Sequence, residues 1–278
     1  MQTTLKLAGY SPKTISAYTD HVRFFAEHFN QSPEDLEDKE IRDYLLYLYE
    51  KRNLSDSYIN IAYSALRFLY ETVLEREWNT KQIPRRKKQK KLPVVLDQSE
   101  VLDVIRNTNN LKHRTILSTI YSAGLRVSEA AHLKVEDIDS KRMQIRIENG
   151  KGRRDRYTLL SKTLLMLLRK YWRAYQPPYW LFPGRPKTKP ISSESIQRIF
   201  RKASNKARIN KRVTPHTFRH CFATHLLEAG TDLRRIQKLL GHKNIRSTSK
   251  YTHLAKDEVL KTQNPFDLVM EVKPNGGS

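Results

Sequence analysis

The stretch Thr214-Pro-His-Thr-Phe-Arg-His-Cys-Phe-Ala-Thr-His-Leu-Leu-Glu-Ala-Gly230 predicts a helix that ends at its final glycine. His216 and Arg219 lie three residues apart in this stretch, so their side chains share one face of the predicted helix. Thr231-Asp232 favours the start of a second helix, and an apolar stripe continues that helix as far as Gly241. The pattern therefore predicts a pair of packed helices with polar groups at their ends.

Four polar side chains in and after this helix pair have the chemistry that phosphoryl transfer needs: His216, Arg219, His242 and Tyr251. A tyrosine oxygen can attack phosphorus and hold it covalently, and an arginine fork can bind two non-bridging oxygens. Histidines can accept or donate protons near neutral pH. Each of these residues alone is more typical of a helix surface, so only their combination, with partners upstream, indicates a site.

The charge of the chain indicates a polyanionic partner. Its 278 residues are enough for two modest domains, and they include 52 Lys and Arg against 29 Asp and Glu. The formal net charge is +23 and the pI is about 10.0, an excess that favours nucleic acid as the partner. Charge alone leaves open a ribosome-like or merely basic protein.

A single cysteine, Cys221, excludes an internal disulfide and favours a reducing compartment. It lies in a mostly apolar helical stretch, so we expect a buried structural thiol and not a nucleophile. No stretch approaches the roughly 20 apolar residues of a membrane span. The sequence therefore predicts a soluble, cytoplasmic protein.

The first 84 residues predict a helical domain. Ser11-Pro12 and Ser32-Pro33 are typical helix starts, and three stretches with helical apolar spacing follow, the last within 55–77. A plain helical bundle explains this pattern as structure. We add the hypothesis that the polar faces of the bundle lie along DNA, with the following basic residues: Lys13, Lys51, Arg52 and Arg67.

Residues 85–93 predict an extended basic linker between two domains, because prolines bracket a run that repels itself. Such a linker would cross a duplex and neutralise several phosphates. The expected DNA-binding residues are Arg85, Arg86, Lys87, Lys88, Lys90 and Lys91. A nuclear-import signal is the competing interpretation of the same residues.

Residues 94–278 predict a second domain, mostly helical with a small β-hairpin. Asp97 to Glu100 is typical of a capping box, and Gly124 and Ser128 favour a helix junction that contains Arg126. The period then changes to two in Met143–Glu148, and a turn with two glycines leads to a return strand over 156–160. Lys151 would lie near the hairpin tip, where flanking glycines permit close approach to a phosphate chain.

Five motifs occur in a fixed order along the chain: Ala123-Gly-Leu-Arg-Val-Ser-Glu-Ala130, Gly150-Lys-Gly-x-x-x-Arg156, His216-Thr-Phe-Arg-His220, Leu240-Gly-His242 and Tyr251-Thr-His253. Together they resemble the tyrosine recombinases, in the Xer-like and phage-integrase branch. The resemblance covers almost the whole chain, although each motif alone is weak. It implies a mainly α fold with a small β-sheet or hairpin, in which a helical DNA-binding domain precedes a mixed α+β catalytic domain.

The resemblance also implies a role for each matching residue. Tyr251 would be the nucleophile, forming a 3′-phosphotyrosyl link and leaving a 5′-hydroxyl. Arg126 and Arg219 would bind the scissile phosphate, with Glu129 supporting the site. The other implied roles are proton donation to the leaving oxygen by Lys151, assistance to proton transfer by His216, a hydrogen bond to the phosphate from His242, and packing by His220. A missing proline in the return strand leaves a shifted hairpin possible, in which Arg153 or Arg154 would partly replace Lys151.

Arginines that stabilise the phosphate charge make a metal unnecessary, and the phosphotyrosine stores the energy for resealing, so neither a metal nor a nucleotide cofactor is expected. The resemblance implies a tetramer on paired, specific double-stranded DNA sites. It also implies that the tail Asp257–Val269 packs onto a neighbouring subunit. The target site, the partner recombinase and the biological task, whether integration, excision or dimer resolution, stay open.

Three other interpretations are weighed against this one. A zinc hydrolase would use His216, His220 and His225, but no glutamate follows His216 and the chain lacks a cysteine pair. A DNA-binding regulator fits the charge but needs no tyrosine beside arginines and histidines. A nicking enzyme like the type IB topoisomerases shares the chemistry, and strand exchange between two sites would distinguish it from a recombinase.

Overall fold

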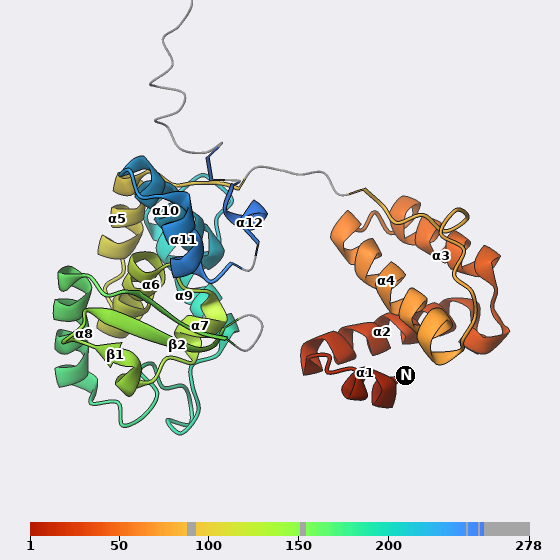
Figure 1. The fold of residues 1–278 in the computed structure, drawn as a ribbon, viewed down its shortest axis with the longest axis horizontal. Helices are drawn as coiled ribbons and strands as arrows, with labels where there is room; N and C mark the ends of the chain where they lie inside the picture. The colour runs from red at the N-terminus through yellow and green to blue at the C-terminus, as the bar shows by residue number, and fades with distance from the viewer. Residues whose placement is uncertain (88–92, 151–153, 243, 250, 253–278) are drawn as a thin grey trace, which may run out of the picture. The chain divides into compact units, whose positions relative to one another are not determined.

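The computed structural model describes residues 1–87, 93–150, 154–242, 244–249 and 251–252. The chain divides into two compact units, Met1–Lys91 and Leu92–Ser278 (Figure 1). Each unit has its own buried apolar core.

The first unit is helical, as the sequence predicts. Its elements are α1 (Gln2–Leu7), α2 (Pro12–Phe29), η1 (Pro33–Asp35), α3 (Asp38–Glu50), α4 (Asp56–Phe68) and the π-helical turn η2 (Leu69–Val73). α2 begins where the Ser11 side chain accepts the Thr14 amide, and it ends at Asn30 in the left-handed conformation. α2 and α4 pack against each other, and Phe25, Ile41 and Leu66 are buried between the helices.

The helix expected over 55–77 ends as a regular α-helix at Phe68 and continues as a wider turn to Val73. This wider turn contains Tyr70, whose hydroxyl donates to the carbonyls of Pro33 and Leu36 at 2.6 and 3.2 Å. A tertiary contact, which helical spacing does not encode, therefore accompanies the change in helix type.

The start of the basic segment lies against this first unit. Arg86 donates from Nε to Asp56 Oδ1 at 2.8 Å, and its guanidinium lies 3.7 Å from the centre of the Tyr49 ring. Asn60 donates to the Arg86 carbonyl and accepts from Arg85 Nε. Arg85 and Arg86, which were expected to begin an extended linker, thus pack on the helical unit, and 88–92 lie outside the described residues.

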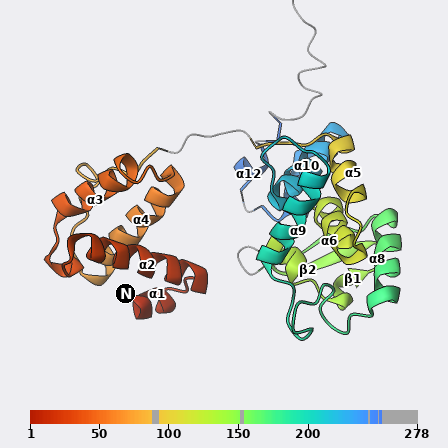
Figure 2. The same cartoon turned by 180° about the vertical axis from the view of Figure 1, so that it is seen from behind.

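The second unit combines helices with a three-stranded antiparallel sheet of order β1-β2-β3 (Figure 2). Its elements are α5 (Gln98–Arg106), α6 (Leu111–Ala123), α7 (Val127–Ala131), η3 (Val135–Asp137), β1 (Ile138–Asp139), β2 (Gln144–Gly150), β3 (Arg154–Leu159), α8 (Lys162–Tyr175), α9 (Ser193–Lys206), α10 (Pro215–Glu228), α11 (Leu233–Leu240) and α12 (Arg246–Ser249). The predicted hairpin is confirmed, with Ile147 opposite Arg156 and Arg146 opposite Tyr157.

Helix α6 is central to this unit, because it packs against α8, α9 and α10. Its residues Ile116, Leu117 and Ile120 are fully buried. Cys221 of α10 is also buried, and its sulfur accepts the Leu96 amide at 3.2 Å. Burial raises the pKa of this thiol to about 11, so Cys221 is the structural thiol that the sequence predicts.

A glycine determines how α6 joins α7. Gly124 ends α6 with φ +61°, and a Cβ placed there would lie 2.4 Å from Phe222 Cδ1 in α10. Only glycine adopts this conformation without steric cost and lets α10 approach so closely. The turn therefore brings Arg126, two residues later, to the start of α7 beside α10.

No helix in the described part of the chain is both long enough and apolar enough to cross a membrane.

We predict that Gly124→Ala lowers the free energy of unfolding of the second unit by about 2–5 kcal/mol. The left-handed conformation contributes about 1–2 kcal/mol of this cost, and the clash with Phe222 contributes about 1–3 kcal/mol. Gly230→Ala is the matched control, since Gly230 has φ +82° and open space around its Cα. Thermal unfolding of both variants tests this, and equal losses of stability would contradict the steric account.

Candidate active site

The site is built on the capping box that begins α7. Arg126 is the residue before the helix, and its backbone N–H donates to Glu129 Oε2 at 2.8 Å. The Arg126 guanidinium donates from Nη1 to Glu129 Oε1 at 2.5 Å. One carboxylate thus fixes both the backbone and the side chain of Arg126.

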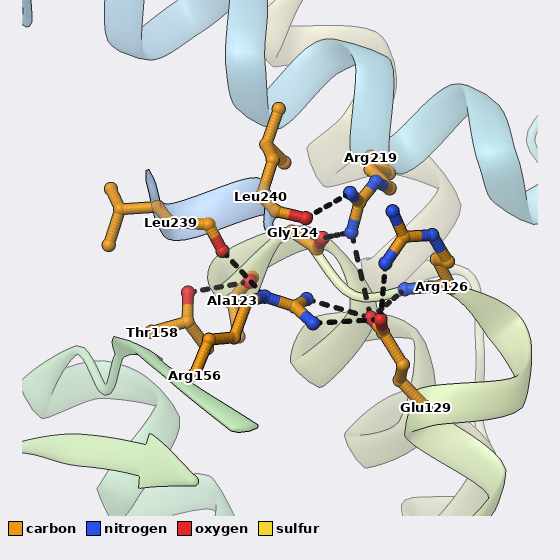
Figure 3. Close-up of polar contacts among 9 residues, drawn as sticks. All are labelled: Ala123, Gly124, Arg126, Glu129, Arg156, Thr158, Arg219, Leu239 and Leu240. Carbon is orange, nitrogen blue, oxygen red and sulfur yellow. Dashed lines mark hydrogen bonds and ion pairs between the residues drawn. The ribbon is translucent and has the colours of Figure 1, made fainter. Parts of the chain in front are cut away.

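The same carboxylate receives a second arginine from the hairpin. Arg156 of β3 donates from Nη1 and Nη2 to the two oxygens of Glu129, each at 2.8 Å (Figure 3). Its Nε donates to the Leu239 carbonyl at 2.9 Å. A bidentate pair of this kind fixes the plane of the guanidinium as well as its position. Arg156 therefore connects β3, α7 and the end of α11.

A third arginine enters the cluster from α10. Arg219 donates from Nη1 to the Gly124 carbonyl at 2.6 Å and from Nη2 to the Leu240 carbonyl at 2.5 Å. Its Nη1 also lies 3.6 Å from Glu129 Oε2. The Arg219 side chain is 1% exposed, whereas that of Arg126 is 21% exposed and reaches the surface.

Burial and opposite charge act against each other at Glu129. Burial alone would raise its pKa, but the hydrogen bonds and charge of Arg156, helped by Arg126 and Arg219, lower the pKa to about 2. Burial, and then the neighbouring Arg126, lower the pKa of Arg219 to about 9, which is still above neutral pH. The three arginines and one carboxylate therefore leave a net positive charge that suits an anionic ligand.

A second group joins α10 to Tyr251. His220 Nδ1 lies 2.9 Å from Tyr251 Oη, and the ring centres of His220 and His216 are 4.5 Å apart. Tyr251 is 1% exposed and packs with Phe222 and Leu240. We expected His220 only to pack, but its ring also contacts the tyrosine hydroxyl.

Burial raises the pKa of Tyr251 to about 12, although the positive charges of Arg219 and Arg126 oppose this shift. The hydroxyl is consequently protonated at neutral pH. Any attack by this oxygen requires a group that accepts its proton, and His220 Nδ1, 2.9 Å from the hydroxyl, is within reach of that role.

His242 follows Gly241, which ends α11 with φ +63°. Its Nδ1 lies 2.9 Å from Thr248 Oγ1 in α12, and its carbonyl accepts from Gln237 Nε2. His242 is therefore held between the end of α11 and the short helix that precedes Tyr251.

The structure brings together Arg126, Glu129 and Arg219 in one cluster, and His216 and Tyr251 about His220. Some predicted residues lie outside the described ones: Lys151, Arg153, Lys88, Lys90 and Lys91. Within the described ranges, no group of three or more His, Cys, Asp or Glu side chains is arranged to hold a metal ion.

Arg156 is the residue whose role the sequence analysis missed, although it closes the Gly150-Lys-Gly-x-x-x-Arg156 motif. One signal was present: Arg156 and Thr158 are two residues apart in β3, so their side chains lie on the same face of the strand. Thr158 is buried and donates to the Ala123 carbonyl at 2.9 Å, so this face points to the junction between α6 and α7. The identity of the partner, Glu129, follows only from the fold.

Two family models match the chain. The phage integrase family matches residues 94–258, and the N-terminal SAM-like domain of phage integrases matches residues 1–80. The arginine cluster, His220 and Tyr251 lie within the first of these matches.

Individual proteins agree with the family match. The chain is 43% identical over 275 residues to a putative integrase/recombinase, y4qK, of Sinorhizobium fredii, covering 99% of this chain and 89% of the relative. It is 35% identical over 258 residues to the tyrosine recombinase XerA of Pyrococcus horikoshii, covering 90% and 86%.

A solved lambda integrase tetramer bound to a Holliday junction has a similar fold, with a TM-score of 0.74 at 19% identity, covering 90% of this chain and 74% of that one. The cluster of arginines and the buried tyrosine agree with these family matches. The chain belongs to the phage integrase family and is a tyrosine recombinase of the Xer-like branch.

Proposed function

We propose that this recombinase cuts and rejoins double-stranded DNA at paired, specific sites, with Tyr251 as the nucleophile. The observation that supports this most strongly is that the same unit holds two groups. One is a buried tyrosine hydroxyl in contact with His220. The other is a cluster of three arginines around one carboxylate, which has a net positive charge. Phosphoryl transfer concentrates negative charge on the phosphate oxygens, and preorganised cationic donors stabilise that charge.

In the proposed step, Tyr251 Oη forms a bond to the scissile phosphorus while the bond from phosphorus to the 5′-oxygen breaks. Arg126 and Arg219 bind the non-bridging oxygens, and His242 donates a further hydrogen bond. The tyrosine proton passes to a histidine, and Lys151 protonates the leaving 5′-oxygen. Attack by a 5′-hydroxyl on the phosphotyrosine reverses the step and reseals the strand.

We propose that the pair of His216 and His220 accepts the tyrosine proton. His220 contacts the tyrosine hydroxyl, and His216 stacks edge-on against the His220 ring. Because Tyr251 is covered in this structure, strand cleavage also requires that its oxygen become accessible to the phosphate.

DNA binding is proposed to use both domains that the sequence predicts, 1–84 and 94–278, and the basic segment 85–93. The expected phosphate contacts are those of Arg85, Arg86, Lys87, Lys88, Lys90 and Lys91. The ion pair with Asp56 orients Arg86 on the first unit while leaving its side chain about one-third exposed. The net charge of +23 supports this extended contact with DNA.

The acting species is proposed to be a tetramer that assembles on DNA through the tail after Tyr251, in the cytoplasm. The lambda integrase tetramer of similar fold supports this assembly. The curated relatives favour a recombinase over a topoisomerase-like nicking enzyme or a regulator without catalysis.

The test is covalent trapping on nicked duplexes taken from the DNA that flanks the gene. The wild type is expected to form an adduct that survives denaturing electrophoresis, whereas Tyr251→Phe binds the same DNA without any adduct. Tyr175→Phe on α8, an exposed tyrosine of the same unit, is the control and should retain the adduct. Adduct formation by Tyr251→Phe would refute the assignment of the nucleophile.

A second prediction concerns the proton acceptor. His220→Phe keeps an aromatic ring but removes the nitrogen beside Tyr251, so single-turnover cleavage should slow by roughly 100-fold, as for loss of a general base. DNA affinity, measured by gel shift, should stay unchanged. The control is His113→Phe, on α6. A cleavage rate equal to wild type would limit His220 to packing.

A further inference from the structure

We propose that Arg156 is a positioning residue for the phosphate-binding arginines, because it balances the charge of Glu129 and thereby keeps the positive charges of Arg126 and Arg219 available to the scissile phosphate. This inference rests on the proposed function. It assigns a role to a residue that touches neither the tyrosine nor, in our account, the DNA.

The contacts of the Arg156 guanidinium lie inside the protein. Its Nη1 and Nη2 both donate to Glu129, and its Nε donates to the Leu239 carbonyl. The side chain is only 10% exposed. All three nitrogens of the guanidinium are therefore engaged inside the protein, and the fork faces away from solvent.

The packing around Arg156 fixes this geometry. A Cβ at Gly241 would lie 2.6 Å from Arg156 Cδ, so the aliphatic part of the arginine passes directly over this glycine. Gly241 ends α11, and His242 follows it. The Arg156 side chain therefore packs directly against the turn that precedes His242.

Charge explains the proposed effect on the other two arginines. Glu129 is almost fully buried and ionised, so it needs a cationic partner. With Arg156 present, one positive charge balances Glu129 and those of Arg126 and Arg219 remain. Without Arg156, only Arg126 at 2.5 Å and Arg219 at 3.6 Å, among these three arginines, would balance the charge of the carboxylate. The phosphate would then compete with the carboxylate for their donors.

The experiment measures single-turnover cleavage and, separately, DNA affinity for the full chain on a nicked duplex that the wild type cleaves. Arg156→Met should slow cleavage by roughly 100-fold, as expected when catalytic groups are displaced by about 1 Å. DNA affinity should change far less. Arg156→Lys keeps the charge without the fork and should give an intermediate rate.

The matched control is Arg146→Met on the neighbouring strand β2. Arg146 pairs with Asp137 at 3.1 Å and Glu148 at 2.6 Å, so this variant also removes an ion-paired arginine from the hairpin. It leaves Glu129 untouched, and its cleavage rate should equal that of the wild type. A loss as large as that of Arg156→Met would assign the effect to hairpin stability and overturn the proposal.

The decisive comparison adds Glu129→Gln, which keeps the shape and the acceptor for the Arg126 amide but removes the charge. The double variant Arg156→Met/Glu129→Gln should cleave about tenfold faster than Arg156→Met, because no carboxylate then competes with the phosphate. If Arg156→Met does not fold, the double variant is compared with Glu129→Gln, and the two should cleave at similar rates.

Two results would overturn the inference while leaving the proposed function intact. One is cleavage by Arg156→Met at the wild-type rate. The other is a double variant no faster than Arg156→Met, or far slower than Glu129→Gln, which would indicate that Arg156 acts independently of Glu129. Failure of the wild type to form any adduct would instead refute the proposed function.

Discussion

A single buried carboxylate organises the catalytic unit. Glu129 accepts hydrogen bonds from Arg126 and Arg156 and lies within ion-pair distance of Arg219. Removing an ionised carboxylate from water is costly unless it is paired and hydrogen-bonded, so these arginines and the elements that carry them must meet at this point. α7, β3 and α10 are thereby held in one arrangement.

Two helix ends complete the arrangement. α6 and α11 both end at glycines in the left-handed conformation, Gly124 and Gly241. The carbonyls at helix C-termini lack partners within the helix and carry partial negative charge, which favours guanidinium groups. Arg219 binds one carbonyl from each helix end, so the glycines give the site its shape as well as ending the helices.

Local signals in the sequence predicted the elements, and the family resemblance implied most of the cluster. Periodicity and capping residues predicted the helices and the hairpin, and the ordered motifs brought Arg126, Glu129 and Arg219 together. The tertiary contacts could not be predicted from these signals. Helical spacing did not indicate that His220 would contact Tyr251, and strand alternation did not indicate that Arg156 would pair with Glu129. Both contacts join segments at least 27 residues apart in sequence, and only packing decides such partners.

The charge state of Glu129 tests this account most directly. Carbon-13 NMR of glutamate-labelled protein, with Glu129→Gln to assign the signal, would follow its carboxyl from pH 7 to pH 3. A pKa near 2 predicts that this signal stays that of the ionised form while exposed glutamates titrate near pH 4.5. The associated stability would be present above pH 4.5 and lost as the pH falls towards 2. A midpoint at or above 4.5 would contradict the account, because the arginines would then not be paired with a buried anion.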